Sequence, residues 1–252
     1  MSQLVLSLFP GIGLLDMAFE RAGFSVAQSR DWIFGGDVRS VRYPAGRFDG
    51  VIGGPPCQAF SRLAHMVRHN GYEPKFGNLI PEFERIVRES APRWFLMEEV
   101  PDAPRPCIEG YENHEFTLNN RQCFDESGKP ATQNRVRAIT FGYRGERRPL
   151  MIETAALHAA QYDYAACGGA GNREIPVRVG GSGKRKGTLN KCVQNNCKGA
   201  AAAAAICERQ GLPLSFIEDS PFRVSDLCKM LGNGVPLPMG AALANAVMEA
   251  TQ

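Results

Sequence analysis

The chain has 252 residues, of which 44% are apolar and 22% are charged, and its formal net charge is +3. This composition is typical of a globular protein that buries a full-sized core. No apolar run approaches the roughly 18 residues that a membrane span requires. The N-terminus lacks the basic flank and cleavage site of a secretory signal. The eight cysteines show no framework spacing, which favours reduced thiols and a cytoplasmic location.

Charge is unevenly distributed along the chain. Residues 143–198 contain ten Lys or Arg and four Asp or Glu, which gives this segment a net charge of +6 and leaves −3 for the remainder. A basic segment joined to a slightly acidic body is typical of a polyanion-binding module, although a solvated basic loop region gives the same pattern. Cys192 and Cys197 lie here, but a closed zinc site needs four ligands, so we expect no metal.

The chain opens with a strand-like apolar run at residues 4–9, a turn at residues 10–13 and a helical pattern at residues 14–22. Strand, glycine turn and helix in this order are typical of the first unit of a nucleotide-binding fold. The turn carries Gly11 and Gly13, which allow a ligand to approach the backbone closely. It lacks the lysine of a P-loop, so a nucleoside without phosphates fits it better.

A second strand-like run at residues 24–27 leads to Asp31 and Trp32. A carboxylate after the second strand suits the two hydroxyls of a ribose. The neighbouring indole offers a flat face for an adenine ring. These two residues therefore indicate an adenosine site next to the glycine turn.

Cys57 follows a buried strand pattern that ends at Ile52 and a Gly-Gly-Pro-Pro turn. Because neither strand nor helix can continue through this turn, the cysteine is placed at the end of a sheet. Open α/β folds bind their ligands at such strand ends. A free cysteine is as often a small buried hydrophobe, so the remaining motifs must decide between the two roles.

Two further acids lie at a strand end. A helical pattern runs from residue 79 to about residue 90. Residues 94–97 then form an apolar strand pattern, which ends at Glu98 and Glu99. Successive strand side chains point to opposite faces, so only one of the two acids can face a site. Between Cys57 and this helix, residues 62–76 form a polar loop with several basic side chains.

Residues 133–137 have the sequence QNRVR and precede an apolar run at residues 138–141. Strand alternation predicts that Gln133, Arg135 and Arg137 share one face. Inward arginines are costly unless they meet anions or hydrogen-bond acceptors. The chain ends with an alanine-rich helical pattern from residue 200, the sequence LGNGVP at residues 231–236 and a C-terminal helix at residues 239–250.

In this order, the motifs resemble those of the DNA (cytosine-5)-methyltransferases. The matching segments are FPGIG at 9–13, GPPCQ at 54–58, EEV at 98–100, QNRVR at 133–137, ERQGLP at 208–213 and GNGV at 232–235. The family pattern at the third motif is Glu-Asn-Val, so Glu98 matches and Glu99 departs. Only four residues separate Trp32 from Asp37, where the family usually has a helix.

The resemblance implies that Cys57 attacks the target base, and that Glu98, Arg135 and Arg137 complete the catalytic set. It also implies S-adenosylmethionine as the cofactor and S-adenosylhomocysteine as its product. Asp37 and Val38 would meet the adenine edge. The full set of expected cofactor-binding residues is Phe9, Gly11, Gly13, Leu14, Asp31, Trp32, Asp37, Val38, Pro55, Leu79, Asn233 and Val235.

The fold implied is a doubly wound, Rossmann-like α/β methyltransferase with a small inserted recognition domain. We expect a catalytic, cofactor-binding domain at 1–142, a target-recognition region at 143–200 and a return to the catalytic domain at 201–252. The implied function is transfer of a methyl group to C5 of a flipped-out cytosine in double-stranded DNA, through an adduct between Cys57 and C6.

Two alternatives remain open from the sequence. The same motifs occur in transfer-RNA cytosine-5 methyltransferases, and the departure at Glu99 also suits a catalytically inactive DNA-binding relative. The compact insert favours a monomer, with a cognate restriction endonuclease as a possible partner. We expect no membrane association.

Overall fold

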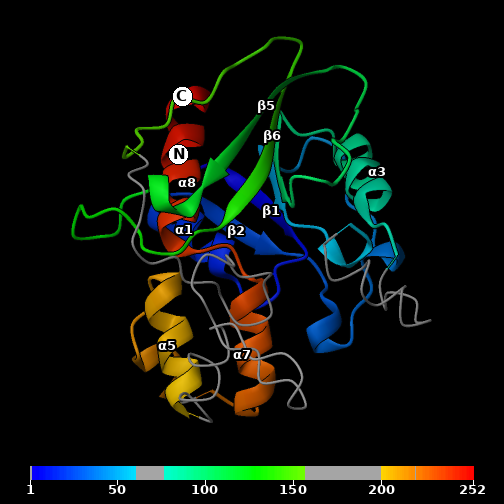
Figure 1. The fold of residues 1–252 in the computed structure, drawn as a ribbon. Coiled ribbons are helices and arrows are strands. Elements are labelled where there is room, and N and C mark those ends of the chain that lie inside the picture. The colour runs from blue at the N-terminus through cyan, green and yellow to red at the C-terminus, as the bar shows by residue number, and fades with distance from the viewer. Residues whose placement is uncertain (1, 61–76, 157–199, 219) are drawn as a thin grey trace, which may run out of the picture. The chain divides into compact units, whose positions relative to one another are not determined.

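The computed structural model of the chain describes residues 2–60, 77–156, 200–218 and 220–252 (Figure 1). The predicted basic loop at 62–76, the cysteines Cys192 and Cys197, and most of the predicted recognition region at 143–200 lie outside the described residues.

The chain divides into two units. The first comprises Met1–Leu118, Val136–Ile152 and Gly240–Gln252, and the second comprises Asn119–Arg135 and Glu153–Met239. The second unit thus takes residues from both parts of the predicted catalytic region, 1–142 and 201–252. The functional roles assigned to those predicted parts stay predictions.

The first unit is built on a six-stranded sheet in the order β2-β1-β3-β4-β6-β5. Strands β1 to β4 are parallel, and β6 runs antiparallel to β4. The strands are β1 (Leu4–Leu8), β2 (Ser25–Gln28), β3 (Gly50–Gly53), β4 (Trp94–Glu99), β5 (Tyr111–Asn119) and β6 (Val136–Arg144). The chain moves outward from β1 to β2 and then returns to the other side of β1 for β3. The gap between β1 and β3 is therefore the point where the strand order reverses, and such points bind ligands in open α/β sheets.

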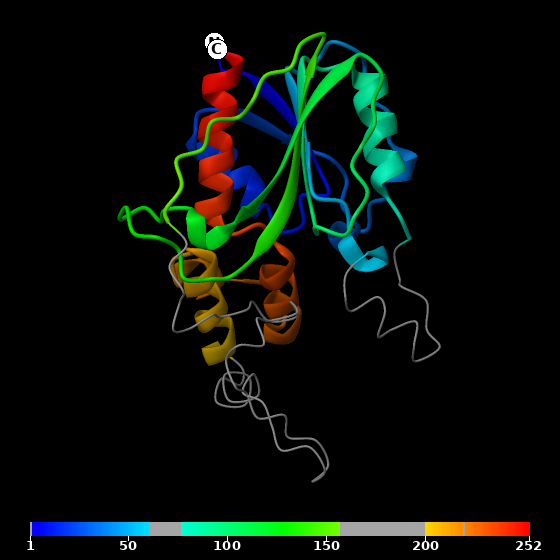
Figure 2. The ribbon, with the colours of Figure 1, turned by 45° about the horizontal axis from the view of Figure 1, so that its top comes forward.

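Helices cover both faces of this sheet (Figure 2). Helices α1 (Leu14–Arg21) and α8 (Leu237–Thr251) lie on one face, and α3 (Ile80–Ser90) lies on the other. On the α1 side the rings of Phe19 and Trp94 are 6.3 Å apart, and on the α3 side those of Phe83 and Phe95 are 5.9 Å apart. Because neighbouring residues of β4 alternate between the faces, Glu98 lies on the face of Trp94, and Glu99 lies on the face of Phe95. The doubly wound α/β fold predicted from the sequence is confirmed.

No α-helix connects β2 to β3. The connection contains only two short 3-10 helices, η1 (Trp32–Phe34) and η2 (Val38–Ser40), as the short spacing in the sequence indicated. Two further 3-10 helices are η3 (Cys57–Ala59) and η4 (Asn120–Gln122). Strand β5 was not anticipated from the sequence, because its side chains show no clean alternation of buried and exposed positions.

The second unit contains helices α5 (Ala200–Gln210), α6 (Ser215–Glu218) and α7 (Val224–Asn233). Helices α5 and α7 pack side by side (Figure 1). Gln210, at the end of α5, donates a hydrogen bond to the carbonyl of Leu231 in α7. The predicted alanine-rich helix is confirmed, and it extends five residues beyond the alanine run.

Candidate active site

Three loops of the first unit converge at one edge of the sheet. Leu8 pairs with Gly53, and Gly53 pairs with Met97, so β1, β3 and β4 end at the same level. Strands β1 and β3 approach each other closely here, since a Cβ on Gly53 would lie 2.7 Å from the Leu8 carbonyl oxygen. The glycine turn, the Pro-Pro-Cys loop and Glu98 are therefore neighbours at this edge.

The glycine turn is held in a left-handed conformation. Phe9, Gly11 and Gly13 have φ angles of 57°, 57° and 80°, and Gly13 N–H donates to the Pro10 carbonyl at 2.8 Å. A Cβ on Gly13 would lie 3.2 Å from Gln28 Nε2, which accounts for glycine there. A Cβ on Gly11 would meet nothing within 4 Å, so the space above that residue is open to a ligand.

Asp31 links this turn to the end of β2. Its Oδ2 accepts from Gly11 N–H at 3.2 Å, and its Oδ1 accepts from Ile33 N–H at 2.7 Å. Each carboxylate oxygen has a second lone pair and can accept a further hydrogen bond. The adjacent indole of Trp32 is 56% exposed. An acceptor carboxylate, an exposed aromatic ring and an open glycine turn are the groups that an adenosine needs.

A buried acid beneath the turn was missed from the sequence. Asp16 of α1 accepts from Ser7 Oγ at 2.5 Å and from Gln28 Nε2 at 2.7 Å. Burial raises the pKa of this carboxyl, although both hydrogen bonds oppose the shift. Through these hydrogen bonds Asp16 connects α1 to β1 and β2 next to the glycine turn. No signal in the sequence indicated its burial, because Asp16 falls outside the apolar face of the helical pattern at residues 14–22.

The remaining predicted cofactor residues of this unit lie around the same edge. Leu14 and Val38 are buried in the core, and Leu79 is the N-cap residue of α3. Pro55 is buried in the loop that leads to Cys57. Asp37 is exposed and forms an ion pair with Arg39 at 2.7 Å, which holds the pKa of the carboxyl below its usual value.

Cys57 begins the 3-10 helix η3, directly after Pro56, and its side chain is half-buried. The loop before it approaches β4 closely, because a Cβ on Gly54 would lie 3.0 Å from Glu98 Oε2. The structure therefore brings the cysteine loop and the predicted acid together.

Glu98 and Arg137 form an ion pair across β4 and β6. Arg137 Nε lies 2.7 Å from Glu98 Oε1, and the two side chains are only 16% and 9% exposed. Glu98 Oε1 nevertheless lacks an aligned hydrogen bond, so this contact is electrostatic and not an aligned N–H···O interaction. Arg137 also donates to the Val136 carbonyl at 2.8 Å. Strand alternation predicted that only one of Glu98 and Glu99 could face the site, and the family resemblance assigned Glu98.

Glu99 lies on the opposite face of β4 and is 2% exposed. Its Oε2 accepts from Val100 N–H at 2.6 Å, and its Oε1 has no hydrogen-bond partner. Burial raises the pKa of this carboxyl to about 8, and the charge of Glu98 adds to the shift. Glu99 is therefore mostly protonated at neutral pH and acts as an uncharged hydrogen-bonding group.

The prediction that Arg135 shares a strand with Arg137 is wrong. Strand β6 begins at Val136, and Arg135 belongs to the second unit. Its guanidinium donates to the carbonyls of Gly232 at 2.7 Å and Asn233 at 3.1 Å, at the C-terminal end of α7. Asn233 and Val235 also lie in the second unit, and their part in cofactor binding stays a prediction.

The fold and the convergence of these loops define a doubly wound α/β protein with an open glycine turn beside a cysteine and a buried Glu–Arg pair. Residues 34–106 match the family model described as C-5 cytosine-specific DNA methylase. The chain is 28% identical over 163 residues to the type II methyltransferase M.NgoPII of Neisseria gonorrhoeae, covering 57% of this chain and 45% of that protein. It is 33% identical over 159 residues to M.FnuDI of Fusobacterium nucleatum, covering 57% and 44%.

The fold is similar to that of the S. pombe Dnmt2 methyltransferase, with a TM-score of 0.59 and 13% identity over 98% of this chain and 99% of that chain. The matches confirm the resemblance to the DNA (cytosine-5)-methyltransferases predicted from the motifs. The chain spans less than half the length of the two bacterial relatives.

Among the residues that the structure describes, no helix combines the length and the apolar character needed to cross a membrane. Within the same ranges, no group of three His, Cys, Asp or Glu side chains is arranged to hold a metal ion.

Proposed function

We propose that this protein is an S-adenosylmethionine-dependent DNA (cytosine-5)-methyltransferase. The observation that carries the proposal is the convergence of the Cys57 loop and the Glu98–Arg137 pair at the sheet edge that also holds the glycine turn. The match of residues 34–106 to the cytosine-5 methylase family supports the same reaction.

The residues at the strand ends of β1 and β2 suit the cofactor. Asp31 would accept from the ribose hydroxyls, Trp32 would cover the adenine ring, and Asp37 with Val38 would meet the adenine edge. The open space above Gly11 leaves room for the remainder of the molecule. When bound, S-adenosylmethionine supplies an electrophilic methyl group.

Cytosine C5 is a poor nucleophile, so the reaction needs a covalent partner. In the proposed mechanism the Cys57 thiolate adds to C6, a proton is gained at N3, and C5 acquires enamine character. Glu98 accepts from the N4 amino group and holds the proton at N3. Arg137 donates to the O2 carbonyl and stabilises the charge that develops there. After C5 is methylated, loss of its proton and expulsion of the Cys57 thiolate restore the ring.

The Glu98–Arg137 pair thus has a role in substrate selection. A cytosine presents donors at N4 and, once protonated, at N3, and it presents an acceptor at O2. An anion beside a cation matches this pattern. Because the reacting faces of a stacked base are covered, the cytosine must leave the duplex before Cys57 can reach it.

Double-stranded DNA is therefore the proposed substrate, and the protein would act as a monomer in the cytoplasm. Two of the relatives are named as type II methyltransferases, so a cognate restriction endonuclease is a proposed partner.

The decisive experiment uses duplex DNA that contains 5-fluorocytosine. Fluorine at C5 blocks the final elimination, so the wild-type protein with cofactor should remain bound to this DNA after denaturation. Cys57→Ala should form no such adduct and transfer no methyl group, yet should still bind DNA. Cys107→Ala is the matched control, because Cys107 is an exposed free cysteine outside the site.

Full methyl transfer by Cys57→Ala would refute the mechanism. Methyl transfer to transfer RNA and not to DNA would assign the first alternative function. DNA binding by the wild type, with no heat from S-adenosylmethionine in calorimetry, would assign the inactive relative.

A further inference from the structure

The connection between β2 and β3 is held by a side chain from α3. In a doubly wound fold this connection normally contains a packed helix, but here η2 is a single 3-10 turn of three residues, Val38–Ser40. Within the turn the Val38 carbonyl accepts only a long hydrogen bond from Val41 N–H at 3.4 Å, and the carbonyls at the end of so short a turn lack helical partners. The groups that satisfy these carbonyls therefore determine how the turn is oriented.

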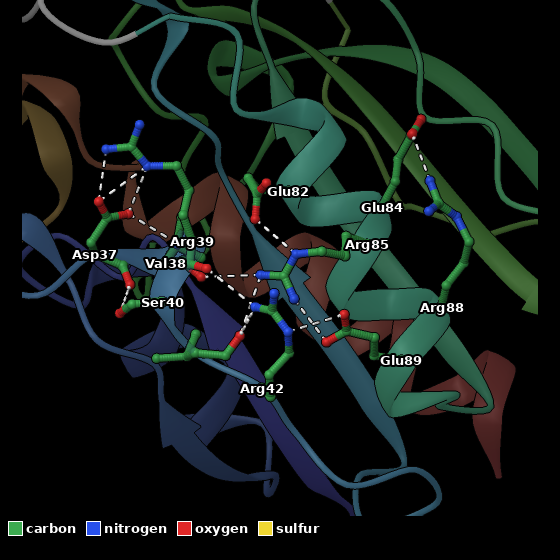
Figure 3. A network of polar contacts seen from close by, with 11 residues as sticks. Asp37, Val38, Arg39, Ser40, Arg42, Glu82, Glu84, Arg85, Arg88 and Glu89 are labelled. Carbon is green, nitrogen blue, oxygen red and sulfur yellow. Dashed lines mark hydrogen bonds and ion pairs between the residues drawn. The ribbon is translucent and has the colours of Figure 1, made fainter.

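Arg85 of α3 binds two of these carbonyls, and Arg42, from the connection itself, donates to those of Val41 at 2.8 Å and Arg39 at 3.1 Å (Figure 3). Arg85 Nη2 donates to the carbonyl of Val38 at 3.2 Å and to that of Val41 at 3.3 Å. The two contacts cross 47 and 44 residues of sequence. Val38 is the first residue of η2 and Val41 is its C-cap residue, so one planar guanidinium contacts both ends of the turn.

The guanidinium is itself fixed by two acids on its own helix. Arg85 Nε pairs with Glu82 at 2.8 Å, and Nη1 pairs with Glu89 at 2.7 Å (Figure 3). The Arg85 side chain is only 19% exposed. Burial opposes its charge, but the hydrogen bonds to Glu89 and Glu82 outweigh this effect, so the pKa lies above the ordinary arginine value. Arg85 therefore presents Nη2 to the turn in one defined geometry.

The turn carries the residues proposed to meet the adenine edge. Val38 is 5% exposed and packs in the same core cluster as Ile80 and Phe83 of α3. Asp37 is the N-cap residue of η2, and its carboxylate binds both the N–H and the guanidinium of Arg39. The position of Asp37 and of the Val38 backbone therefore follows from how the turn is anchored to α3.

We infer that Arg85 is a positioning residue for the adenine side of the cofactor site, where it replaces the packing that a crossover helix would otherwise provide. The inference rests on the proposed function, because it assumes that Asp37 and Val38 face the adenine ring.

Arg88 offers a matched control on the same helix. It forms an ion pair with Glu84 at 3.1 Å, within α3, and its side chain is 52% exposed. Both Arg85→Gln and Arg88→Gln remove a charge from α3, the first with its two intrahelical ion pairs and the second with its one. Arg85→Gln also removes the two hydrogen bonds to the turn. Glu89→Gln is an intermediate variant, because it removes the acid that pairs with both Arg85 at 2.7 Å and Arg42 at 3.5 Å but leaves both arginines in place.

The test is calorimetric binding of S-adenosylhomocysteine and of S-inosylhomocysteine, in which the adenine amino group is replaced by oxygen. We expect Arg85→Gln to raise the Kd for S-adenosylhomocysteine about tenfold, equivalent to about 1.4 kcal/mol. The preference of the wild type for the adenine ligand should also decrease. Arg88→Gln should bind within about twofold of wild type, because exposed pairs contribute little.

If Arg85 only stabilises the fold, Arg85→Gln should have a lower melting temperature and the same ratio of Kd values for S-adenosylhomocysteine and S-inosylhomocysteine as wild type. That result would overturn the inference. If Arg85→Gln does not fold, Arg85→Lys keeps the charge, but its three N–H donors cannot replace all four contacts of the guanidinium, and it should show the same loss of preference. Binding by Arg85→Lys that equals wild type for both ligands would also overturn it. Absence of any binding by the wild type would instead count against the proposed function.

Discussion

Arg137 Nε lies 2.7 Å from Glu98 Oε1, on neighbouring antiparallel strands at the end of the sheet. Both side chains are mostly buried, and both are proposed to bind the cytosine. The pair therefore has two roles that experiments can separate. It balances charge in the free protein, and it provides a matched anion and cation for the base.

The first prediction concerns the loss of one partner of this pair. Arg137→Gln and Glu98→Gln should each lower the free energy of unfolding by about 2–4 kcal/mol, because the remaining charge stays buried without its partner. The double variant should recover much of that loss, and neither it nor the single variants should transfer methyl groups at a measurable fraction of the wild-type rate. Urea denaturation and a methyl-transfer assay provide the two measurements. Equal stability of all four proteins would show that the pair contributes nothing to folding.

Gly54 provides a second prediction, because a Cβ there would lie 3.0 Å from Glu98 Oε2. We expect Gly54→Ala to displace the carboxylate and to reduce kcat by about 10- to 100-fold, since small displacements of catalytic groups are costly. The melting temperature should change little, because the end of a glutamate side chain can move. Gly77→Ala is the control, since a Cβ at Gly77 would meet nothing within 4 Å. Unchanged kcat in Gly54→Ala would place Glu98 outside the chemistry.

Arg135 leads to a third prediction, in which stability and not chemistry is lost. Arg135→Met leaves the carbonyls of Gly232 and Asn233 without their donor, and Arg135 is only 7% exposed. We expect the free energy of unfolding to decrease by about 2–4 kcal/mol, as for other buried hydrogen bonds to a charged group. At a temperature where the variant is folded, kcat should remain within about tenfold of wild type, a change equivalent to about 1.4 kcal/mol. A loss of kcat as large as that of Arg137→Gln would restore Arg135 to the catalytic set.

The sequence predicted the parts of the site that lie at strand ends. The glycine turn, Cys57 and Glu98 each follow a short apolar run and a break in the pattern, and such breaks are local signals. Arg135 and Arg137 carry the same local signal, but β6 begins between them at Val136. The carbonyls that bind Arg135 lie 97 and 98 residues further along the chain, so no local pattern could have separated the two roles.

Other contacts could not be predicted either, because their partners are also distant in the sequence. Arg85 reads as a helix-surface residue between Glu82 and Glu89, and its bonds to Val38 and Val41 depend on how α3 packs. The environment of Glu99 was also inaccessible from the sequence. Strand alternation places it opposite Glu98, but its burial to 2% exposure depends on the tertiary packing of that face.

Glu99 leads to the last prediction, which concerns pH. The pKa of its carboxyl is raised from 4.5 to about 8 in the folded protein, mainly by burial. Between these two values the unfolded chain releases the proton and the folded chain keeps it. Stability contributed by the protonated form is therefore complete below pH 4.5 and is lost as the pH rises through 8. The expected slope is at most about 1.4 kcal/mol for each pH unit.

Glu99→Gln keeps the shape of the protonated acid and cannot ionise, so this slope should disappear. Its amide oxygen can still accept from Val100 N–H, which bonds to Glu99 Oε2 at 2.6 Å in the wild type. We expect the difference in free energy of unfolding between Glu99→Gln and wild type to grow in favour of the variant from pH 5 to pH 8. Urea denaturation at pH 5, 6.5 and 8 measures this difference, with Glu112→Gln as the control because Glu112 is exposed. A constant difference across that range would mean that Glu99 is ionised in the folded protein. In that case its negative charge would lie beside Glu98 during catalysis, and Glu99 would not act as a neutral hydrogen-bonding group.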